Sequence, residues 1–322
     1  MKKIILILTL TIFTSLFTSS TIYAETADEY FEQGNQFYSE NKYEQAIEAY
    51  NKAIELNSQD HRFYANRNQS VRSLMNPALF EKALDDINKS LELDPTNPTY
   101  YFYRGLTYHY LNRPARAIGD FTKAIELNPD KSNYYFNRGN IYQLIEKHEK
   151  ATIDFSKAIE LDPSDLRSFM GRGRSYQKLG QHDKAILDYT KSINLFPHMA
   201  SNYSSRALSL ASIEQHEKAI SDYTKAIQIE PKNQFYYQDR GISYLHTNQI
   251  EKSLHDFTQS FSIDPNRLDV TLYLANIYYY LKIPHEAIFY YEHALKLLQE
   301  PHYQESLETI TLIKQRLTEL KN

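Results

Sequence analysis

The feature that most constrains this chain is a sequence period of 34 residues. Residues 100–130 read YYFYRGLTYHYLNRPARAIGDFTKAIELNPD, and residues 134–164 read YYFNRGNIYQLIEKHEKATIDFSKAIELDPS. A small residue recurs with this period, at Gly105, Gly139, Gly173, Ala207, Gly241 and Ala275. Such a period indicates an array of similar units, each of which buries its apolar face against its neighbours.

A second set of small residues recurs with the same period and shows where residues are inserted. The step between Ala46 and Ala83 is 37 residues, and the extra residues fall between Asn68 and Ala83, around SLMNPAL. The later members follow at steps of 34, at Ala117, Ala151, Ala185, Ala219, Ser253 and Ala287. The two rows predict eight repeats that start near residues 27, 61, 98, 132, 166, 200, 234 and 268.

Each repeat is predicted to form two helices. Tyr135, Gly139 and Tyr142 are spaced at i, i+4 and i+7, which places them on one helix face. Pro163 ends the second helix, because the residue before a proline disfavours helical geometry. The same apolar spacing recurs on the second helix, at Ala151, Phe155 and Ala158.

The order of these residues resembles the tetratricopeptide repeat (TPR) family. The shared pattern begins with an aromatic residue, continues with arginine or leucine directly before glycine, and then has a tyrosine. Alanine, an aromatic residue, alanine and proline follow in that order. The resemblance covers residues 25–300 and implies an all-α, right-handed superhelical solenoid of stacked helix-turn-helix repeats. Residues 301–322 are expected to form a C-terminal capping helix.

The first 24 residues have the three-part layout of a secretory signal peptide. Lys2 and Lys3 precede an apolar run from Ile4 to Phe17, and a small polar stretch ends at Ala24. The apolar run is short for a bilayer span, which needs about 20 apolar residues. We therefore expect cleavage after Ala24, no stable membrane insertion, and export to a periplasm or out of the cell. The alternative is an uncleaved segment that anchors the chain in the membrane.

A charged pair recurs inside the repeats. Arginine precedes the small residue in repeats two to seven, and aspartate follows 16 residues later, or 19 across the insertion. Repeats one and eight lack both. Since pairing between neighbouring repeats would strand two buried charges, this co-occurrence predicts a bond within each repeat. The predicted pairs are Arg67–Asp86, Arg104–Asp120, Arg138–Asp154, Arg172–Asp188, Arg206–Asp222 and Arg240–Asp256.

The resemblance also implies where a partner binds, because the first helices of TPR proteins line a concave groove. Aromatic groups with a basic centre in repeat five favour a segment with apolar anchors and an acidic group. For any one aromatic residue, the alternative is packing against the adjacent first helix. Carried over by position, the groove residues are Phe102, Leu106, His109, Tyr110, Phe136, Asn140, Gln143, Arg167, Met170, Arg174, Lys178, Phe235, Ile242, Leu245 and Tyr279.

Other classes of function find little support in the sequence. A formal net charge of -4 argues against nucleic-acid binding. The repeats leave no residues for a catalytic domain, and no phosphate-binding loop or nucleophile motif occurs. His148, His182 and His216 lie one repeat apart, roughly 10 Å in a stack, which is too far for one zinc ion.

We therefore expect a non-enzymatic scaffold or adaptor that binds a protein or peptide in its groove, with no cofactor and no metal. The chain contains no cysteine, so it has neither disulfides nor a lipid-attachment cysteine after the signal. The alternative function is a membrane-tethered subunit of an envelope assembly or secretion complex. The identity of the partner and the oligomeric state stay open at this stage.

Overall fold

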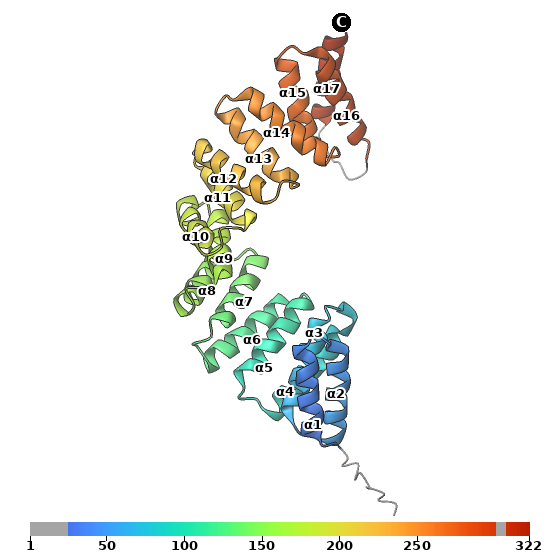
Figure 1. Ribbon diagram of the computed structural model, residues 1–322, viewed down its shortest axis with the longest axis vertical. Coiled ribbons are helices and arrows are strands. Elements are labelled where there is room, and N and C mark those ends of the chain that lie inside the picture. The colour runs from blue at the N-terminus through green and yellow to red at the C-terminus, as the bar shows by residue number, and fades with distance from the viewer. Residues whose placement is uncertain (1–24, 301–306) are drawn as a thin grey trace, which may run out of the picture. The chain divides into compact units, whose positions relative to one another are not determined.

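The computed structural model describes residues 25–300 and 307–322. The predicted signal peptide, and the first residues of the predicted cap, lie outside this part. The described residues form 17 α-helices and one short 3₁₀ helix and contain no strand (Figure 1). The protein is therefore an all-helical array of eight helix-turn-helix pairs, followed by a single helix.

The helices of each pair have constant lengths. The first helix always has 13 residues, and the second has 14. The first helices are α1 (Ala27–Ser39), α3 (His61–Ser73), α5 (Pro98–Tyr110), α7 (Ser132–Leu144), α9 (Leu166–Lys178), α11 (Ala200–Ser212), α13 (Gln234–His246) and α15 (Leu268–Tyr280). They begin at the residues where the period places the repeat starts.

The second helices complete the pairs, and the insertion lies before one of them. The 3₁₀ helix η1 (Pro77–Leu79) occupies the inserted stretch between α3 and α4. The second helices are α2 (Tyr43–Leu56), α4 (Phe80–Leu93), α6 (Pro114–Leu127), α8 (His148–Leu161), α10 (His182–Leu195), α12 (His216–Ile229), α14 (Ile250–Ile263) and α16 (Pro284–Leu297). The last helix is α17 (Leu307–Lys321).

Contacts divide the chain into two compact units. One unit runs to Thr96 and contains α1 to α4, and the other begins at Asn97 and contains α5 to α17. Within each unit, every helix packs against the next helix along the chain (Figure 1). None of the described helices is long and apolar enough to cross a membrane.

Aromatic rings of the second helices fill the core beside small residues of the first helices. Phe121 of α6 is fully buried, and its ring lies against Gly105 of α5. A Cβ atom at Gly105 would lie 2.6 Å from this ring, which explains why a small residue recurs there. The second repeat has the buried Ile87 at this position. The equivalent rings of the remaining repeats are also buried, at Tyr50, Phe155, Tyr189, Tyr223, Phe257 and Tyr291.

The turn inside each pair contains one residue with a left-handed backbone. Glycine adopts this conformation without strain, but only one repeat has glycine there, Gly180 at φ 70°. The other repeats place a residue with a Cβ atom at φ between 52° and 60°, at Asn41, Met75, Asn112, Glu146, Glu214, Asn248 and Lys282.

The last helix, α17, covers the end of the array. Ile313 and Leu317 are buried in one apolar cluster with Ala287 and Ala294 of α16. Arg316 donates hydrogen bonds to Asn276 Oδ1 of α15 and, at 2.7 Å, to the Tyr291 hydroxyl. Residues that would otherwise form an exposed apolar end are therefore packed.

Candidate binding surface on the first helices

The arginine of each central repeat is bonded to the aspartate of the same repeat. Arg138 Nε and Nη2 lie 2.8 Å and 2.7 Å from the two carboxylate oxygens of Asp154. Both side chains are largely buried, with exposed fractions of 17% and 4%. The same two-bond arrangement joins Arg67 to Asp86, Arg104 to Asp120, Arg172 to Asp188, Arg206 to Asp222 and Arg240 to Asp256.

A third bond joins Arg67, Arg138, Arg172, Arg206 and Arg240 to the preceding repeat. Arg138 Nη1 donates to Thr122 Oγ1 of α6 at 3.0 Å. Although burial alone lowers the pKa of Arg138, the bond to Asp154 raises that pKa above its ordinary value. The guanidinium group stays charged and compensated, so it offers no free anion site. The equivalent third partners are Asn51, Ser156, Thr190 and Thr224.

Neighbouring first helices are linked by glutamine side chains. Gln143 Nε2 of α7 donates to Ser175 Oγ and to the Gly171 carbonyl oxygen of α9, both at 2.8 Å. Gln177 Nε2 of α9 donates to Ser209 Oγ of α11 at 3.1 Å. Gln143, a predicted groove residue, therefore holds two first helices together.

Three other predicted groove residues also have packing roles. Phe102 is only 8% exposed, and its ring lies 4.9 Å from the ring of Tyr134 in the next repeat. Phe102 is therefore a core residue, which corrects its assignment to the groove. Ile242 and Leu245 are partly buried against the cluster formed by α14 and α15.

Tyr279 is covered by the last helix. Its hydroxyl donates to Glu319 Oε2 at 2.7 Å, and the guanidinium of Arg316 lies 4.8 Å from its ring centre. The last helix therefore occupies the position where a partner was expected to contact Tyr279.

The remaining predicted residues differ in their exposure. Leu106, Phe136, Asn140 and Met170 are half-buried. The guanidinium of Arg167 lies over the ring of Phe136 at 4.7 Å and pairs with Asp165 at 2.8 Å, so both side chains are engaged. The exposed members are His109, Tyr110, Arg167, Arg174, Lys178 and Phe235.

Arg174 and Lys178 form a basic pair on α9. They are exposed, lie one helical turn apart, and make no ion pair with any carboxylate of the described residues. Leu144 of α7 occupies the repeat position that Lys178 holds on α9, and Leu208 of α11 occupies the position that Arg174 holds; the two leucines are 56% and 48% exposed. Two uncompensated cations are thus flanked by exposed leucines on adjacent first helices.

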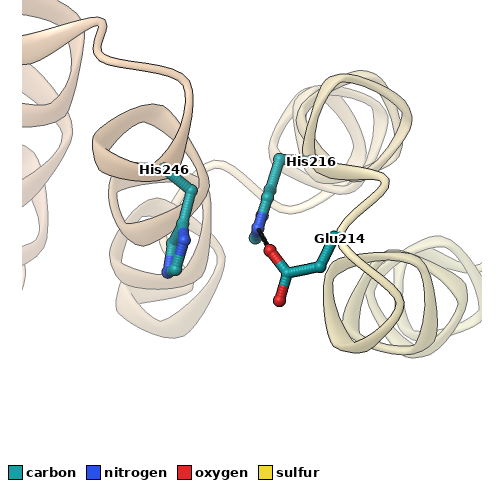
Figure 2. Close-up of side chains that lie close together, drawn as sticks. All are labelled: Glu214, His216 and His246. Carbon is teal, nitrogen blue, oxygen red and sulfur yellow. Dashed lines mark hydrogen bonds and ion pairs between the residues drawn. The ribbon is translucent and has the colours of Figure 1, made fainter.

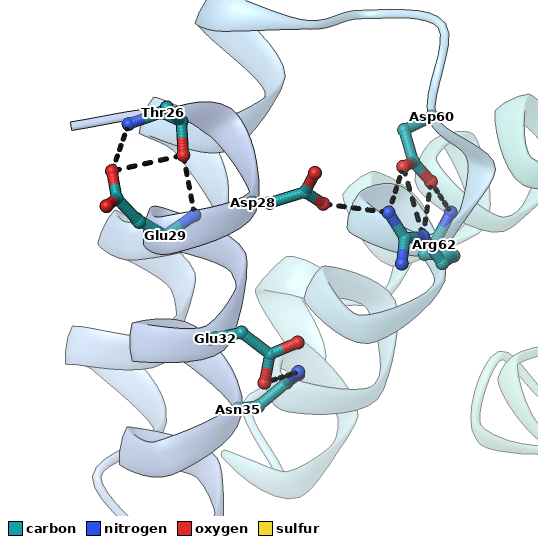
Figure 3. Close-up of polar contacts among 7 residues, drawn as sticks. All are labelled: Thr26, Asp28, Glu29, Glu32, Asn35, Asp60 and Arg62. Atoms are coloured by element: carbon teal, nitrogen blue, oxygen red, sulfur yellow. Dashed lines mark hydrogen bonds and ion pairs between the residues drawn. The ribbon is translucent and has the colours of Figure 1, made fainter. Parts of the chain in front are cut away.

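In the first two repeats, by contrast, the basic side chain on the first helix is paired with carboxylates (Figure 3). Arg62 of α3 pairs with Asp60 at 2.6 Å and with Asp28 of α1 at 2.9 Å. Thr26 and Glu29 form a reciprocal cap at the start of α1. Because Arg62 is neutralised by two carboxylates, the basic pair of α9 is the better candidate for binding an anion.

Comparisons with known proteins agree with this repeat structure. A model of the TPR repeat matches residues 34–68. Models of the tetratricopeptide repeat match residues 98–131 and 132–165, and residues 166–199 and 200–233. A search of curated protein sequences found no match.

Solved structures share the arrangement. YrrB, described as a TPR protein with an unusual peptide-binding site, is 26% identical over 63% of this chain and 99% of its own, with a TM-score of 0.52. The C-terminal part of a TPR repeat-containing protein from Cytophaga hutchinsonii is 20% identical over 74% of this chain and 97% of its own, with a TM-score of 0.62. A protein from Parabacteroides merdae is 19% identical over 85% of this chain and 99% of its own, with a TM-score of 0.56.

The last two similarities show the fold alone. The matched repeats, the helix pairs and the recurring spacing of the small and aromatic residues within this chain agree with one another. This chain is a tetratricopeptide repeat protein, a member of a family whose proteins bind proteins and peptides and are typically non-catalytic scaffolds.

Proposed function

We propose that this protein is an exported, non-catalytic scaffold that binds an acidic protein or peptide segment across the first helices of repeats four to six. The observation that carries the proposal is the basic pair Arg174 and Lys178, which makes no ion pair within the described part of the chain and is flanked by exposed leucines. The similarity to YrrB, with its peptide-binding site, supports a segment of chain as the ligand.

The two kinds of side chain contribute in different ways. An exposed ion pair contributes little by itself, about 0–1 kcal/mol. Burying a leucine side chain contributes more, about 1.5–3 kcal/mol. We therefore expect the leucines to supply affinity, while the basic pair selects an acidic group and discriminates against a neutral one.

The spacing of the first helices sets the spacing of the ligand. Equivalent residues on neighbouring first helices lie roughly 10 Å apart, and an extended chain advances about 3.3 Å per residue. A ligand that crosses from Leu144 to Lys178 and from Arg174 to Leu208 therefore needs two acidic residues, each with an apolar residue about three positions away on its outer side.

A pair of synthetic peptides tests this proposal. One carries two central glutamates flanked by leucines at this spacing, and the other carries glutamine in place of glutamate. We expect the full chain to bind the acidic peptide about tenfold more tightly in fluorescence anisotropy, since two exposed ion pairs at up to about 1 kcal/mol each are sufficient for this difference. Arg174→Glu combined with Lys178→Glu should abolish this preference.

The matched control moves the same charge change to second helices. Lys191 of α10 and Lys225 of α12 are exposed, and Lys191→Glu with Lys225→Glu should leave the preference intact. If both peptides bind equally to all three proteins, the basic pair does not recognise the ligand. If the control loses the preference too, net charge rather than the first-helix face explains the binding.

Export is tested separately, in cells that produce the full chain. Mass spectrometry of the native protein should find a chain that begins at Glu25, since cleavage is expected after Ala24. An intact Met1 in the membrane fraction would instead support the membrane-tethered subunit. The peptide-binding result does not depend on this outcome, so the two parts of the proposal can fail independently.

A further inference from the structure

Three side chains with metal-binding atoms meet where the sixth repeat packs on the seventh (Figure 2). Glu214 lies in the turn after α11, His216 is the first residue of α12, and His246 is the last residue of α13. One ligand atom from each lies within 4.8 Å of the others. No other three histidine or acidic side chains of the described residues meet in this way.

The three side chains are already in contact. His216 Nε2 lies 3.1 Å from Glu214 Oε2. The imidazole rings of His216 and His246 stack with their centres 4.2 Å apart and their planes 13° apart. The His216 side chain is 10% exposed, whereas that of Glu214 is 82% exposed. Helix packing therefore holds one imidazole in place, and the more mobile ligands lie at the surface.

We propose that Glu214, His216 and His246 bind a divalent metal ion of the zinc type. Imidazole nitrogen and carboxylate oxygen are the ligands that Zn²⁺ takes in proteins, at about 2.0–2.2 Å. Around a tetrahedral ion, ligand atoms lie about 3.3 Å apart, close to the observed 3.1 Å between His216 and Glu214. The ligand atoms lie within 4.8 Å of one another and must close by at most about 1.5 Å. The exposed His246 ring must also turn out of its stacked position, because imidazole binds a metal through a nitrogen in the plane of its ring.

The repeats contain their own comparison, because the same three positions recur at two earlier interfaces. One earlier set is Glu146, His148 and Lys178, and the other is Gly180, His182 and Ser212. Each of these sets keeps the central histidine but lacks at least one ligand. The complete set of two histidines and a carboxylate therefore does not follow from the repeat pattern alone.

One feature of His216 is shared by the equivalent histidines of other repeats and is therefore not evidence for a metal site. Its Nδ1 atom is buried without a hydrogen-bond partner, but so are the Nδ1 atoms of His148 and His182. The inference therefore rests on the meeting of three ligands and not on this atom.

A bound ion would act on two parts of the protein. It would cross-link α12 to α13, and so tie the sixth repeat to the seventh. With three protein ligands it would keep at least one coordination position open to solvent. It would also place positive charge at the end of α13, at the position that Lys178 holds on α9.

Zinc titration of the untagged full chain tests the inference, after treatment with a chelator. We expect calorimetry to find one tightly bound Zn²⁺ per chain. His246→Ala should weaken this binding at least tenfold, and because His246 is exposed, the variant should keep its fold. The matched control is His182→Ala, which removes the equivalent of His216 at an incomplete interface and should bind Zn²⁺ like the wild type.

A gain of binding provides the second arm. Lys178→Ala should leave one ion per chain, whereas Lys178→His completes the set with Glu146 and His148 and should raise the number to two. Binding by the wild type that is no tighter than that of His246→Ala would overturn the proposal and assign the zinc to scattered surface histidines. A Lys178→His protein that still binds one ion would show that these three positions do not define a site.

Discussion

At the scale of single residues, Arg138 shows how a charged side chain can serve the fold. Its guanidinium contacts Asp154 in its own repeat and Thr122 in the preceding one, so one residue joins three helices. Asp154 is almost fully buried. Without the arginine, its carboxylate would lose its counter-charge in a poorly solvated position, which is strongly unfavourable.

We therefore expect Arg138→Met to lower the free energy of unfolding by about 3–5 kcal/mol. Arg138→Met combined with Asp154→Leu should be milder, because no unpaired charge stays buried. Urea unfolding followed by circular dichroism measures both. A single variant as mild as the double variant would show that the pair is not coupled.

Asp239 predicts a pH effect on stability. Burial raises the pKa of Asp239 from 3.8 to about 6. The positive charge of Arg267 lowers this pKa, and the negative charge of Asp269 raises it further. The folded chain therefore binds more protons than the unfolded chain between about pH 4 and 6, and stability is lost as the pH rises through this window.

Replacing Asp239 by asparagine removes this loss. Asp239→Asn should be more stable than the wild type at pH 7.5, and the difference should shrink towards zero at pH 4. Thermal unfolding at the two pH values tests this, with Asp183→Asn at an exposed position of α10 as the control. A constant difference at both pH values would mean that the asparagine acts through packing and not through charge.

At the scale of elements, α17 takes the place of a ninth first helix. In the first repeat, Asn35 Oδ1 accepts hydrogen bonds from a tyrosine of its second helix and from Asn66 of the next first helix. At the other end, Asn276 Oδ1 accepts from the equivalent tyrosine and from Arg316 of α17. The cap thus repeats the bonding of a neighbouring repeat with different side chains.

Two adjacent residues of α17 test how much the cap contributes. Ile313 is 2% exposed and Leu312 is 46% exposed. Ile313→Ala should destabilise α15 and α16 by about 2–5 kcal/mol, because it leaves a cavity, whereas Leu312→Ala should have little effect. Hydrogen exchange of α15 and α16 measures both changes. Equal exchange in the two variants would indicate that α17 does not protect the eighth repeat.

At the scale of the whole molecule, contacts run between neighbours along each compact unit. Stability in such an array is approximately a sum of terms for each repeat and each interface. Damage in one repeat should therefore stay local.

Phe155 of α8 provides the test, since its ring is fully buried. Phe155→Ala should destabilise its surroundings by about 3–5 kcal/mol and speed hydrogen exchange in α7 to α10, while α15 to α17 keep their protection. Phe289→Ala, at a position that is 54% exposed, is the control. Faster exchange throughout α5 to α17 would indicate a single cooperative unit.

The fold could be predicted from the sequence because eight copies report the same helix boundaries and the same small and aromatic positions. The surface is harder to predict, because the groove residues are defined by fixed positions within one repeat. Such positions do not reveal what the next helix covers, as the packing of Phe102 against Tyr134 and of Tyr279 against Glu319 shows.

A comparison of residues exactly one period apart also misses contacts between different positions of neighbouring repeats. His216 and His246 are 30 residues apart, and Gln143 and Ser175 are 32 apart, slightly less than one period. The contact of His216 with His246 joins the start of a second helix to the end of the next first helix, and the contact of Gln143 with Ser175 joins two neighbouring first helices. His148, His182 and His216 do follow the full period, but they do not contain the contact between His216 and His246.

The left-handed turn residues have a consequence for protein engineering. A residue with a Cβ atom in this conformation is strained by about 1–2 kcal/mol, so glycine at Glu146 is expected to strengthen the array while removing only an exposed side chain. Glycine at Glu214 would relieve the same strain but would also delete a carboxylate from the metal cluster. The turn at Glu146 can therefore be stabilised without loss, whereas the turn at Glu214 cannot be changed without removing a proposed metal ligand.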